Sequence, residues 1–355
     1  MGYHRMMQRC LASILFVMLA FTSALPARAA APSVSNTASP LIPVRIGFPQ
    51  TNYWPLFLAR DLGLFKEAGL EPHFHPFTTG APLITGMTNG ELDIAWTGLA
   101  TVFILGKGTP LTYVLVTMDH SSQVSMVVKP GSGIRSYKDL KKSKAIGAPS
   151  GTCSAVSTVL ATRKIGMPLS SVNITNLAPN LLLGALQNDQ IDTAFIWGPW
   201  DIQLREAGFK IVSKDKDYVP GNSVCGVTVA IRPAFLERHP SVGCKMVKVQ
   251  ALALEAAARH PEKAIQSIQK ELNLSYELAK ESYETLVIPS IKSQLQPNAP
   301  WSLTNETGGL AQKLKMAADA LYETKSFAQP LSRDTIWRSI DAKYIKQYLS
   351  TDCKS

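Results

Sequence analysis

The sequence predicts an α/β protein with two similar lobes that are joined by two crossover segments. Three observations support this fold class: a long internal repeat, an alternation of strand and helix patterns within each copy, and two β-rich segments where the chain can pass between copies. The tetrapeptide at 46–49 (IGFP) returns at 146–149 (IGAP), and the heptapeptide at 89–95 (NGELDIA) returns at 188–194 (NDQIDTA). The offsets, 100 and 99 residues, agree, and a repeat of this length fits a small α/β lobe better than a solenoid unit.

The first copy alternates short β-rich runs with apolar residues at helical spacing, which favours parallel strands and right-handed crossovers. The helix predicted over 53–68 ends at Gly69, as helices commonly do. The predicted strands are 44–48, 70–77, 92–96, 114–118 and 124–128, and the predicted helices are 53–68 and 82–89.

The second copy repeats this order of elements after a Pro-Gly-Ser-Gly stretch at 130–133, where a chain readily passes into another lobe. Its predicted strands are 145–148, 172–177, 191–197 and 209–212, and its predicted helices are 153–165 and 181–188.

The last third of the chain follows a predicted strand at 227–231 and is helical, without a partner in the repeat. Its predicted helices are 242–259, 261–272, 275–286, 303–324 and 336–349. We expect these helices to cover the first lobe, and we expect crossings at 124–130 and 224–231 to form a hinge. The first lobe is then 44–128 with 228–355, and the second lobe is 129–227.

The N-terminal segment has the pattern of a secretory signal peptide. Arg5 and Arg9 precede an uncharged apolar run at 11–25, and small residues follow up to Ala29. We expect a signal peptide over 1–29, a disordered lead-in over 30–43, and a mature protein in the periplasm. Cys10 precedes the apolar run, so a lipoprotein anchor is not expected.

The composition is that of an ordinary folded soluble protein, with 46% hydrophobic and 17% charged residues, so neither disorder nor a membrane-spanning bundle is indicated. The net charge of +10 is consistent with an anionic ligand or a nucleic acid, but the scattered lysines favour an ordinary solvated surface. Four cysteines follow the signal peptide, namely Cys153, Cys225, Cys244 and Cys353, and they allow three pairings. We favour Cys244 with Cys353, because both fall in one predicted lobe.

Candidate ligand-binding residues lie in the loops after the predicted strands, because parallel α/β sheets bind ligands beyond the carboxyl ends of their strands. These loops are rich in Thr, Ser, Asn, Gly and Trp and poor in charge. In the first copy the candidates are Gln50, Thr51, Asn52, Trp54, Thr79, Gly80, Trp96 and Thr97. In the second copy they are Ser150, Thr152, Cys153, Ser154, Trp197, Trp200 and Asp201.

The loop at 150–154 is the most specific of these signals, because small residues at the start of a helix let backbone N–H groups and hydroxyls converge on an oxyanion. Ordinary helix capping explains the same residues without a ligand. Because Thr51 lies at the equivalent position of the first copy, we give ligand binding and helix capping equal weight. Four of the six tryptophans lie at these loops, which fits either core packing or apolar walls around a small ligand.

Other chemistry has little support in the sequence. His73 and His75 share a strand face without a third ligand nearby, so no metal site is expected. No cofactor motif is present. Cys153 at a helix start can be a nucleophile with a lowered pKa, but no base lies at an interpretable spacing. Asp93 and Asp192 are paired by the repeat, which favours a scaffold role over a catalytic one.

The order and spacing of several short segments resemble a known family, the periplasmic substrate-binding proteins of importers for nitrate, taurine and alkanesulfonates. The segments are the pattern over 55–69 with its glycines, Thr79-Gly80-Ala81, Asn89 to Asp93, Asp139-Leu140 ahead of Ile146-Gly147, Gln187 to Asp192 running into Trp197-Gly198-Pro199, and Arg232 to Phe235 followed by His239-Pro240. The resemblance runs from about residue 44 to residue 258.

The resemblance implies a two-lobed periplasmic binding protein of the type II-like class. Such a protein is expected to be a monomer that closes on a small anionic solute and delivers it to a permease in the inner membrane, without nucleic acid. Taurine-binding relatives are expected to hold an acid near the return crossover, but 223–227 carries none and only Asp201 can substitute, so a sulfonate or other anion without an amine is preferred. An enzyme on this scaffold that uses Cys153, and a ligand-sensing partner of a membrane receptor, remain alternatives.

Overall fold

The computed structural model of the protein describes residues 40–78, 80–221 and 223–354. The predicted signal peptide at 1–29, most of the predicted lead-in at 30–43, Cys10 and the candidate residue Thr79 lie outside the described residues. The lead-in prediction is wrong at its end, because the first strand already begins at Ile42. In the part of the chain that the structure describes, no helix is both long and apolar enough to cross a membrane.

The first sheet has the strand order β2-β1-β3-β10-β4. Its strands are β1 (Ile42–Pro49), β2 (Leu70–Phe77), β3 (Ile94–Thr97), β4 (Thr112–Asp119) and β10 (Gly226–Ile231). Strand β1 pairs in parallel with β2 and β3, whereas β10 is antiparallel to both β3 and β4.

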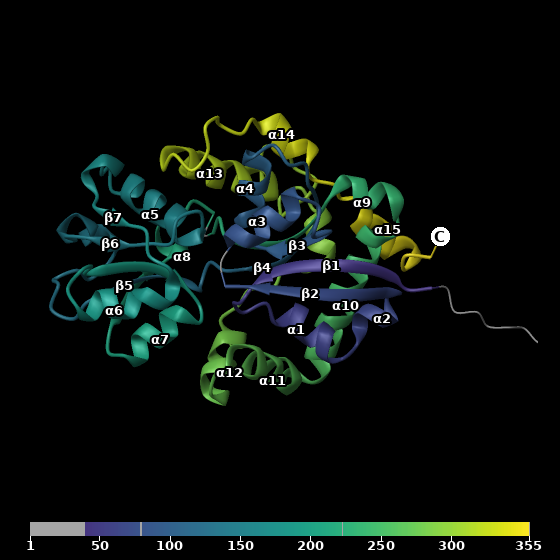
Figure 1. The fold of residues 1–355 in the computed structure, drawn as a ribbon, viewed down its shortest axis with the longest axis horizontal. Coiled ribbons are helices and arrows are strands. Elements are labelled where there is room, and N and C mark those ends of the chain that lie inside the picture. Colours follow the sequence, from purple (N-terminus) through teal and green to yellow (C-terminus); the bar gives the residue numbers. More distant parts are fainter. Residues whose placement is uncertain (1–39, 79, 222, 355) are drawn as a thin grey trace, which may run out of the picture. The chain divides into compact units, whose positions relative to one another are not determined.

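The second sheet has the equivalent order β7-β6-β8-β5-β9. Its strands are β5 (Val124–Val128), β6 (Ile146–Gly147), β7 (Ile174–Thr175), β8 (Thr193–Trp197) and β9 (Lys210–Lys214). The sequence repeat reappears in the pairing register, because Ile46 pairs with Ile94 in the first sheet and Ile146 pairs with Thr193 in the second. Figure 1 shows the two sheets in separate parts of the fold.

The antiparallel strand of each sheet corrects the prediction of purely parallel pairing. Strand β5 pairs with β8 and β9, so residues 124–128 belong to the second sheet and not to the first lobe. Strand β10 begins at Gly226, so the crossings are at 120–123 and 219–225 instead of 124–130 and 224–231. A β-rich run has the same composition in either sheet, and only its pairing partners decide where it belongs.

The helices that connect the strands mostly match the predicted positions. They are α1 (Trp54–Asp61), α2 (Leu64–Glu67), α3 (Gly80–Thr88), α4 (Ala100–Gly106), α5 (Cys153–Lys164), α6 (Leu182–Gln187), α7 (Trp200–Glu206) and α8 (Asp215–Tyr218). The single helix predicted over 53–68 is in fact two helices, because Gly63 has a left-handed conformation with φ of 72° between them. The short helices α4, α7 and α8 were not predicted.

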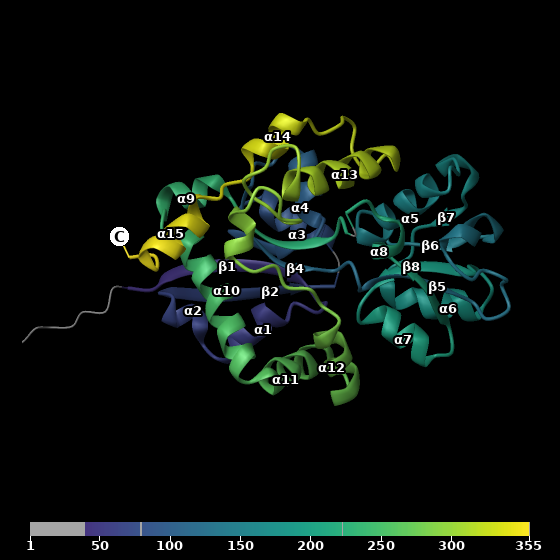
Figure 2. The ribbon, with the colours of Figure 1, turned by 180° about the vertical axis from the view of Figure 1, so that it is seen from behind.

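The C-terminal helices are α9 (Pro233–Arg238), α10 (Val242–Arg259), α11 (Pro261–Leu272), α12 (Tyr276–Glu284), α13 (Gly309–Glu323), α14 (Arg333–Arg338) and α15 (Lys343–Thr351). In Figures 1 and 2, α13 and α14 lie above the first sheet and α11 and α12 lie below it. These helices also reach the second lobe. Arg205 of α7 donates two hydrogen bonds, of 2.5 and 2.8 Å, to Glu281 of α12, and Arg163 of α5 pairs with Glu323 of α13 at 2.5 Å.

The predicted scaffold role of Asp93 and Asp192 is confirmed by matching contacts. The backbone N–H of Arg45 donates to Asp93 Oδ2 at 3.1 Å, and the N–H of Lys144 donates to Asp192 Oδ2 at 2.9 Å. Burial by itself would raise the pKa of Asp93, but hydrogen bonds from Arg45 and Arg232 outweigh it and hold that pKa below its usual value. Asp93 therefore binds β1 at Arg45, and Asp192 binds Lys144 just before β6, and each of these two strands leads to a candidate loop.

The expected Cys244–Cys353 disulfide is present, with 5.6 Å between its Cα atoms, and it joins α10 to the residues after α15. The other two cysteines of the described residues, Cys153 and Cys225, also form a disulfide, with a Cα–Cα distance of 5.8 Å.

Candidate ligand-binding site

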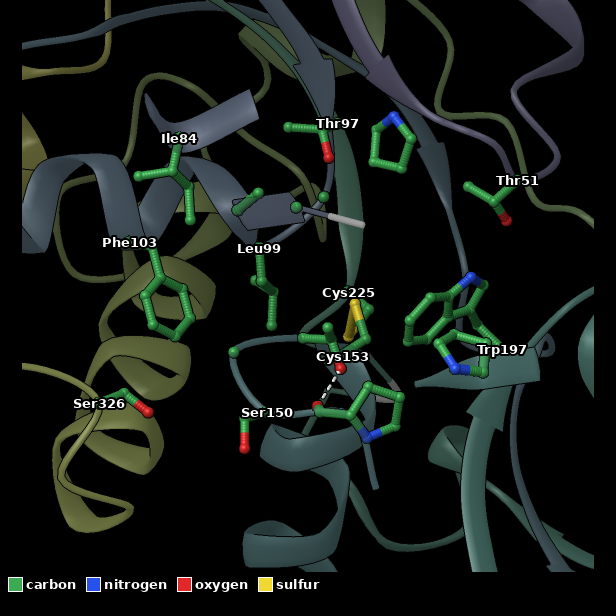
Figure 3. Close-up of a pocket in the computed structure, with 18 of the residues that line it drawn as sticks. Thr51, Ile84, Thr97, Leu99, Phe103, Ser150, Cys153, Trp197, Cys225 and Ser326 are labelled. Atoms are coloured by element: carbon green, nitrogen blue, oxygen red, sulfur yellow. Dashed lines mark hydrogen bonds between the residues drawn. A yellow bond between two sulfur atoms is a disulfide. The ribbon is translucent and has the colours of Figure 1, made fainter. Parts of the chain in front are cut away.

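A cavity of about 740 Å³ lies between the two sheets, at the loops that follow the repeated strands. Eight of the candidate residues line it: Gln50, Thr51, Gly80, Thr97, Ser150, Thr152, Cys153 and Trp197. Figure 3 shows part of this wall, with Thr51 and Thr97 from the first sheet and Ser150, Cys153 and Trp197 from the second. The loops of both copies therefore contribute to one cavity, as the repeat predicted.

The N-terminus of α5 forms one part of the wall. Thr152 is the N-cap residue, but its hydroxyl donates to the carbonyl of Pro149 at 2.7 Å and makes no side-chain cap to the helix. The first-turn N–H groups of this 12-residue helix therefore have no side-chain cap. Such groups, together with the helix dipole, favour an anion.

The loop before α5 closely approaches the first lobe. Gly151 has φ of 75°, and a Cβ added there would lie 2.8 Å from Cζ of Phe103 on α4. The position therefore requires glycine for its left-handed backbone and for its contact with Phe103. Since Phe103 also lines the cavity, Gly151 and Phe103 close one side of it.

A direct hydrogen bond joins the two lobes on another side. Thr51 Oγ1 donates to the carbonyl of Gly198 at 2.6 Å, and both groups are buried. The N–H of Gly198 in turn donates to the carbonyl of Gln123 in the outward crossing, at 2.9 Å. The lobes are thus in contact, as expected for a binding protein in its closed arrangement.

His120 and Tyr53 form a neutral polar part of the wall. The rings stack with 6.1 Å between centroids and 24° between planes. Burial lowers the pKa of His120 to about 4 and raises the pKa of Tyr53 to about 12, so both are uncharged near neutral pH. The His120 side chain bonds the backbone of Asn52, and its Nε2 has no partner among the described residues.

The charges around the cavity are few and of one sign. Among the residues that the structure describes, no Asp or Glu lines the cavity, and the Lys and Arg side chains that line it are Lys107 and Lys325, both exposed. No carboxylate of the described lining can therefore pair with a ligand ammonium, and the electrostatics of the cavity favour an anionic or neutral ligand.

Residues 50–264, more than half of the chain, match the family described as NMT1/THI5 like. The chain belongs to the NMT1/THI5-like family. This NMT1/THI5-like protein is 26% identical to a binding protein of Brucella abortus over 238 residues, which cover 66% of this chain and 72% of the relative. It is 25% identical to an aliphatic sulfonates-binding protein of Escherichia coli over 265 residues, 74% of this chain and 78% of the relative.

Solved structures share the fold of this NMT1/THI5-like protein. The periplasmic aliphatic sulphonate binding protein SsuA of Escherichia coli matches with a TM-score of 0.68 at 18% identity, over 84% of this chain and 98% of that chain. The desulfurization enzyme DSZB matches with a TM-score of 0.61 at 12% identity, over 88% and 99% of the chains. The predicted family and the two-lobed α/β binding-protein fold are therefore confirmed.

Six candidate residues of the NMT1/THI5-like chain do not line the cavity: Asn52, Trp54, Trp96, Ser154, Trp200 and Asp201. Asn52 is fully buried and donates to Ser282 of α12, and Trp54 packs against Tyr283 with 5.2 Å between ring centroids. Trp96 and Ser154 are fully buried, and Trp200 packs against the core of the second lobe. These tryptophans follow the core-packing alternative.

Asp201 is 3% exposed and does not replace the missing acid. Its Oδ2 accepts from Ser125 Oγ at 2.7 Å and its Oδ1 from the N–H of Ile202 at 2.8 Å, which anchors α7 to β5. Burial raises the pKa of this carboxyl. The expectation that Asp201 can meet a ligand amine is wrong.

Sequence reasoning missed several residues of the wall. They are Ile84, Phe103, Lys107, His120, Asn176, Cys225 and residues 324–326. His120 belongs to the outward crossing, which was predicted at 124–130, whereas Cys225 lies within the predicted return crossing at 224–231 but was not named as a site residue. Residues 324–326 follow α13, which has no repeat partner.

Cys153 is bonded to Cys225 in this NMT1/THI5-like protein. The sulfur of Cys153 is therefore no free thiolate and cannot act as a nucleophile while this bond is intact.

Proposed function

We propose that this protein is the extracytoplasmic solute-binding component of an importer and that it captures a small organic anion between its two lobes. The observation that carries the proposal is the combination of an uncapped α5 N-terminus with a cavity that contains no acid. A bound oxyanion would accept hydrogen bonds from the first turn of α5, and Lys107 and Lys325 would attract it from solution.

We prefer a sulfonate or a similar anion without an amine. A taurine-like ligand would bring an ammonium into a cavity without a carboxylate, which costs desolvation energy with no ion pair in return. The volume of about 740 Å³ lies within the usual range of about 300–1,000 Å³ for organic ligand sites. Apolar side chains such as Ile84, Leu99, Phe103 and Trp197 line the wall, so an alkyl or aryl group on the anion would find contacts.

The proposed partner is a permease of the inner membrane, to which the closed protein would deliver its ligand. The proposed location is the periplasm, because the sequence pattern of 1–29 predicts export and a fold neighbour is a periplasmic sulphonate-binding protein. The fold also supports an enzyme, DSZB, but the disulfide-bonded Cys153 gives no reason to prefer catalysis here.

Isothermal titration and thermal shift of the mature protein test this function with matched solutes. We expect ethanesulfonate, butanesulfonate and benzenesulfonate to bind more tightly than taurine or nitrate, because only taurine carries an ammonium and nitrate leaves the apolar wall unfilled. A ligand at one hundred times its Kd would stabilise the folded protein by about 2.7 kcal/mol. Absence of a shift with every sulfonate, carboxylate and inorganic anion would contradict the proposal.

A further inference from the structure

The Cys153–Cys225 disulfide joins the two lobes within the wall of the ligand cavity. Cys153 is the first residue of α5 in the second lobe, and Cys225 directly precedes β10 of the first sheet. Both cysteines line the cavity, and Figure 3 shows their bond among the other lining residues. The cysteines are 72 residues apart in the sequence, and the segment between them contains most of the second lobe.

The backbone alone connects the lobes at two neighbouring places. The outward crossing is at 120–123, and the described residues of the return crossing are 219–221 and 223–225. The crossings lie side by side, because the N–H of His120 donates to the carbonyl of Cys225 at 3.0 Å. Two neighbouring connections form a hinge, about which rigid lobes can still rotate.

The disulfide adds a third connection that bypasses the return crossing. It links α5 directly to the residue before β10, so rotation about the backbone bonds of the return crossing is opposed by a short covalent link. Two neighbouring connections leave the lobes free to rotate relative to each other about one axis, whereas a third connection at another place restricts that rotation.

The Cys225 end of this link is firmly held. Cys225 is 1% exposed, and a Cβ added at the next residue, Gly226, would lie 2.5 Å from the ring of Trp301. Trp301 is fixed in turn, because its Nε1 donates to Asp119 Oδ2 at 2.8 Å and Lys313 Nζ lies 4.5 Å from the centroid of its ring. A displacement of Cys225 would therefore disturb a packed region of the first lobe.

The Cys153 end lies at the proposed anion site. Cys153 begins the helix whose first-turn N–H groups would bind the anion, and its Sγ would lie 3.7 Å from a Cβ added at Gly98 of the first lobe. The disulfide thus fills the space between the loop after β3 and the start of α5. Without this bond, the start of α5 would be held to the first lobe by noncovalent contacts alone.

We propose that the Cys153–Cys225 disulfide is a positioning element of the ligand site, which holds the N-terminus of α5 against the first lobe and limits how far the cavity opens. Its effect on ligand affinity rests on the proposed function, whereas its effect on opening does not. The bond lowers the conformational freedom that the ligand-free protein has to lose when it closes, and so it should tighten binding.

The second disulfide provides a matched control. Cys244–Cys353 closes a sequence separation of 109 residues, and neither of its cysteines lines the cavity. Loop-closure entropy depends only on the logarithm of loop length, so loss of either disulfide should destabilise the fold to a similar extent. Only loss of Cys153–Cys225 should alter the ligand site.

The experiment compares the double variant Cys153→Ser, Cys225→Ser with Cys244→Ser, Cys353→Ser and with the unsubstituted mature protein. Butanesulfonate is the probe for isothermal titration, and small-angle X-ray scattering gives the radius of gyration without ligand. We expect the first variant to raise Kd about tenfold and to increase the ligand-free radius, and the second to change Kd less than twofold and the radius not at all. Cys153→Ala with Cys225→Val supplies an apolar replacement if the serine pair does not fold.

Equal radii of gyration for all three ligand-free proteins would overturn the proposal, and so would equal weakening of binding in the two variants. If the unsubstituted protein binds no sulfonate, the proposed function fails, but the scattering comparison still decides whether the disulfide limits opening.

Discussion

Thr51 Oγ1 donates a buried hydrogen bond of 2.6 Å to the carbonyl of Gly198, from the loop after β1 to the loop after β8. In the repeat, β1 corresponds to β6 and β8 corresponds to β3, so the bond joins two non-equivalent loops at the carboxyl ends of their strands. The contact crosses between the lobes and therefore exists only while they are closed together.

Thr51→Val should weaken ligand binding, because the substitution removes the donor and leaves the buried carbonyl of Gly198 without it. Loss of such a bond costs roughly 1–2 kcal/mol, which corresponds to roughly 5- to 30-fold in Kd. Thr51→Ser keeps the hydroxyl and should bind nearly as the unsubstituted protein does. Titration with butanesulfonate measures both variants, and equal loss in both would show that the hydrogen bond is not responsible.

Gly151→Ala should also act on closure. The added Cβ would lie 2.8 Å from the Phe103 ring on the opposite lobe, and this contact is relieved when the lobes separate. Gly133→Ala is the matched control, because Gly133 has a similar φ of 73° with nothing within 4 Å of the added Cβ. Both variants should lose roughly 1 kcal/mol of stability from the left-handed backbone. Only Gly151→Ala should raise the Kd of butanesulfonate, by about tenfold, and equal Kd values would contradict the role of this contact.

The exposed side chains of Lys107 and Lys325 should increase the association rate constant of an anionic ligand. Replacing both with Gln should lower the association rate constant roughly two- to fivefold at low salt, and the difference should nearly vanish at ~1 M salt, where the Debye length is only ~3 Å. Lys138→Gln with Lys141→Gln removes the same charge from exposed positions that do not line the cavity. Stopped-flow kinetics with butanesulfonate compares the two pairs, and a similar slowing in both would indicate an effect of net charge alone.

The stability of the fold should depend on His120 below neutral pH. Burial lowers its pKa from 6.5 to about 4, so the unfolded chain binds the extra proton first. The contribution of neutral, buried His120 to the free energy of unfolding is therefore complete above pH 6.5 and is lost as the pH falls toward 4. By pH 5 the loss is about 2 kcal/mol. His120→Gln removes this titration.

Urea unfolding at pH 7.5 and pH 5 measures the difference between His120→Gln and the unsubstituted protein. Other groups titrate in both proteins, such as Asp215, whose pKa burial raises to about 7, and they cancel in the comparison. A stability difference that does not change with pH would show that His120 is already solvated in the fold.

Local sequence patterns predicted the positions of many individual strands and helices. Strands such as β2 and β5 and the helices α10 and α11 were located to the residue, and Asp93 and Asp192 were correctly assigned to the scaffold. Strand membership was not predicted, because residues 124–128 pair with partners up to ninety residues away in sequence, and nothing within the run identifies those partners.

The repeat located the loops of the site but not the direction of each side chain. Trp96 was expected to line the cavity and does not. Every residue of β3 is buried, so no alternation of polar and apolar residues shows which side chain points to the cavity. His120 and Cys225 lie in crossings without repeat partners, and the neutral state of His120 follows from burial that only the three-dimensional fold creates.

Strand β10 also constrains the order in which the two lobes can fold during synthesis of the chain. It lies between β3 and β4 of the first sheet, yet it is synthesised after every strand of the second sheet. Until β10 is made, β4 therefore has no described strand of its own sheet to pair with, whereas β5 to β9 are contiguous in sequence and can already assemble. The second lobe is thus expected to fold first, and the arrival of β10 completes the first lobe and brings Cys225 to Cys153.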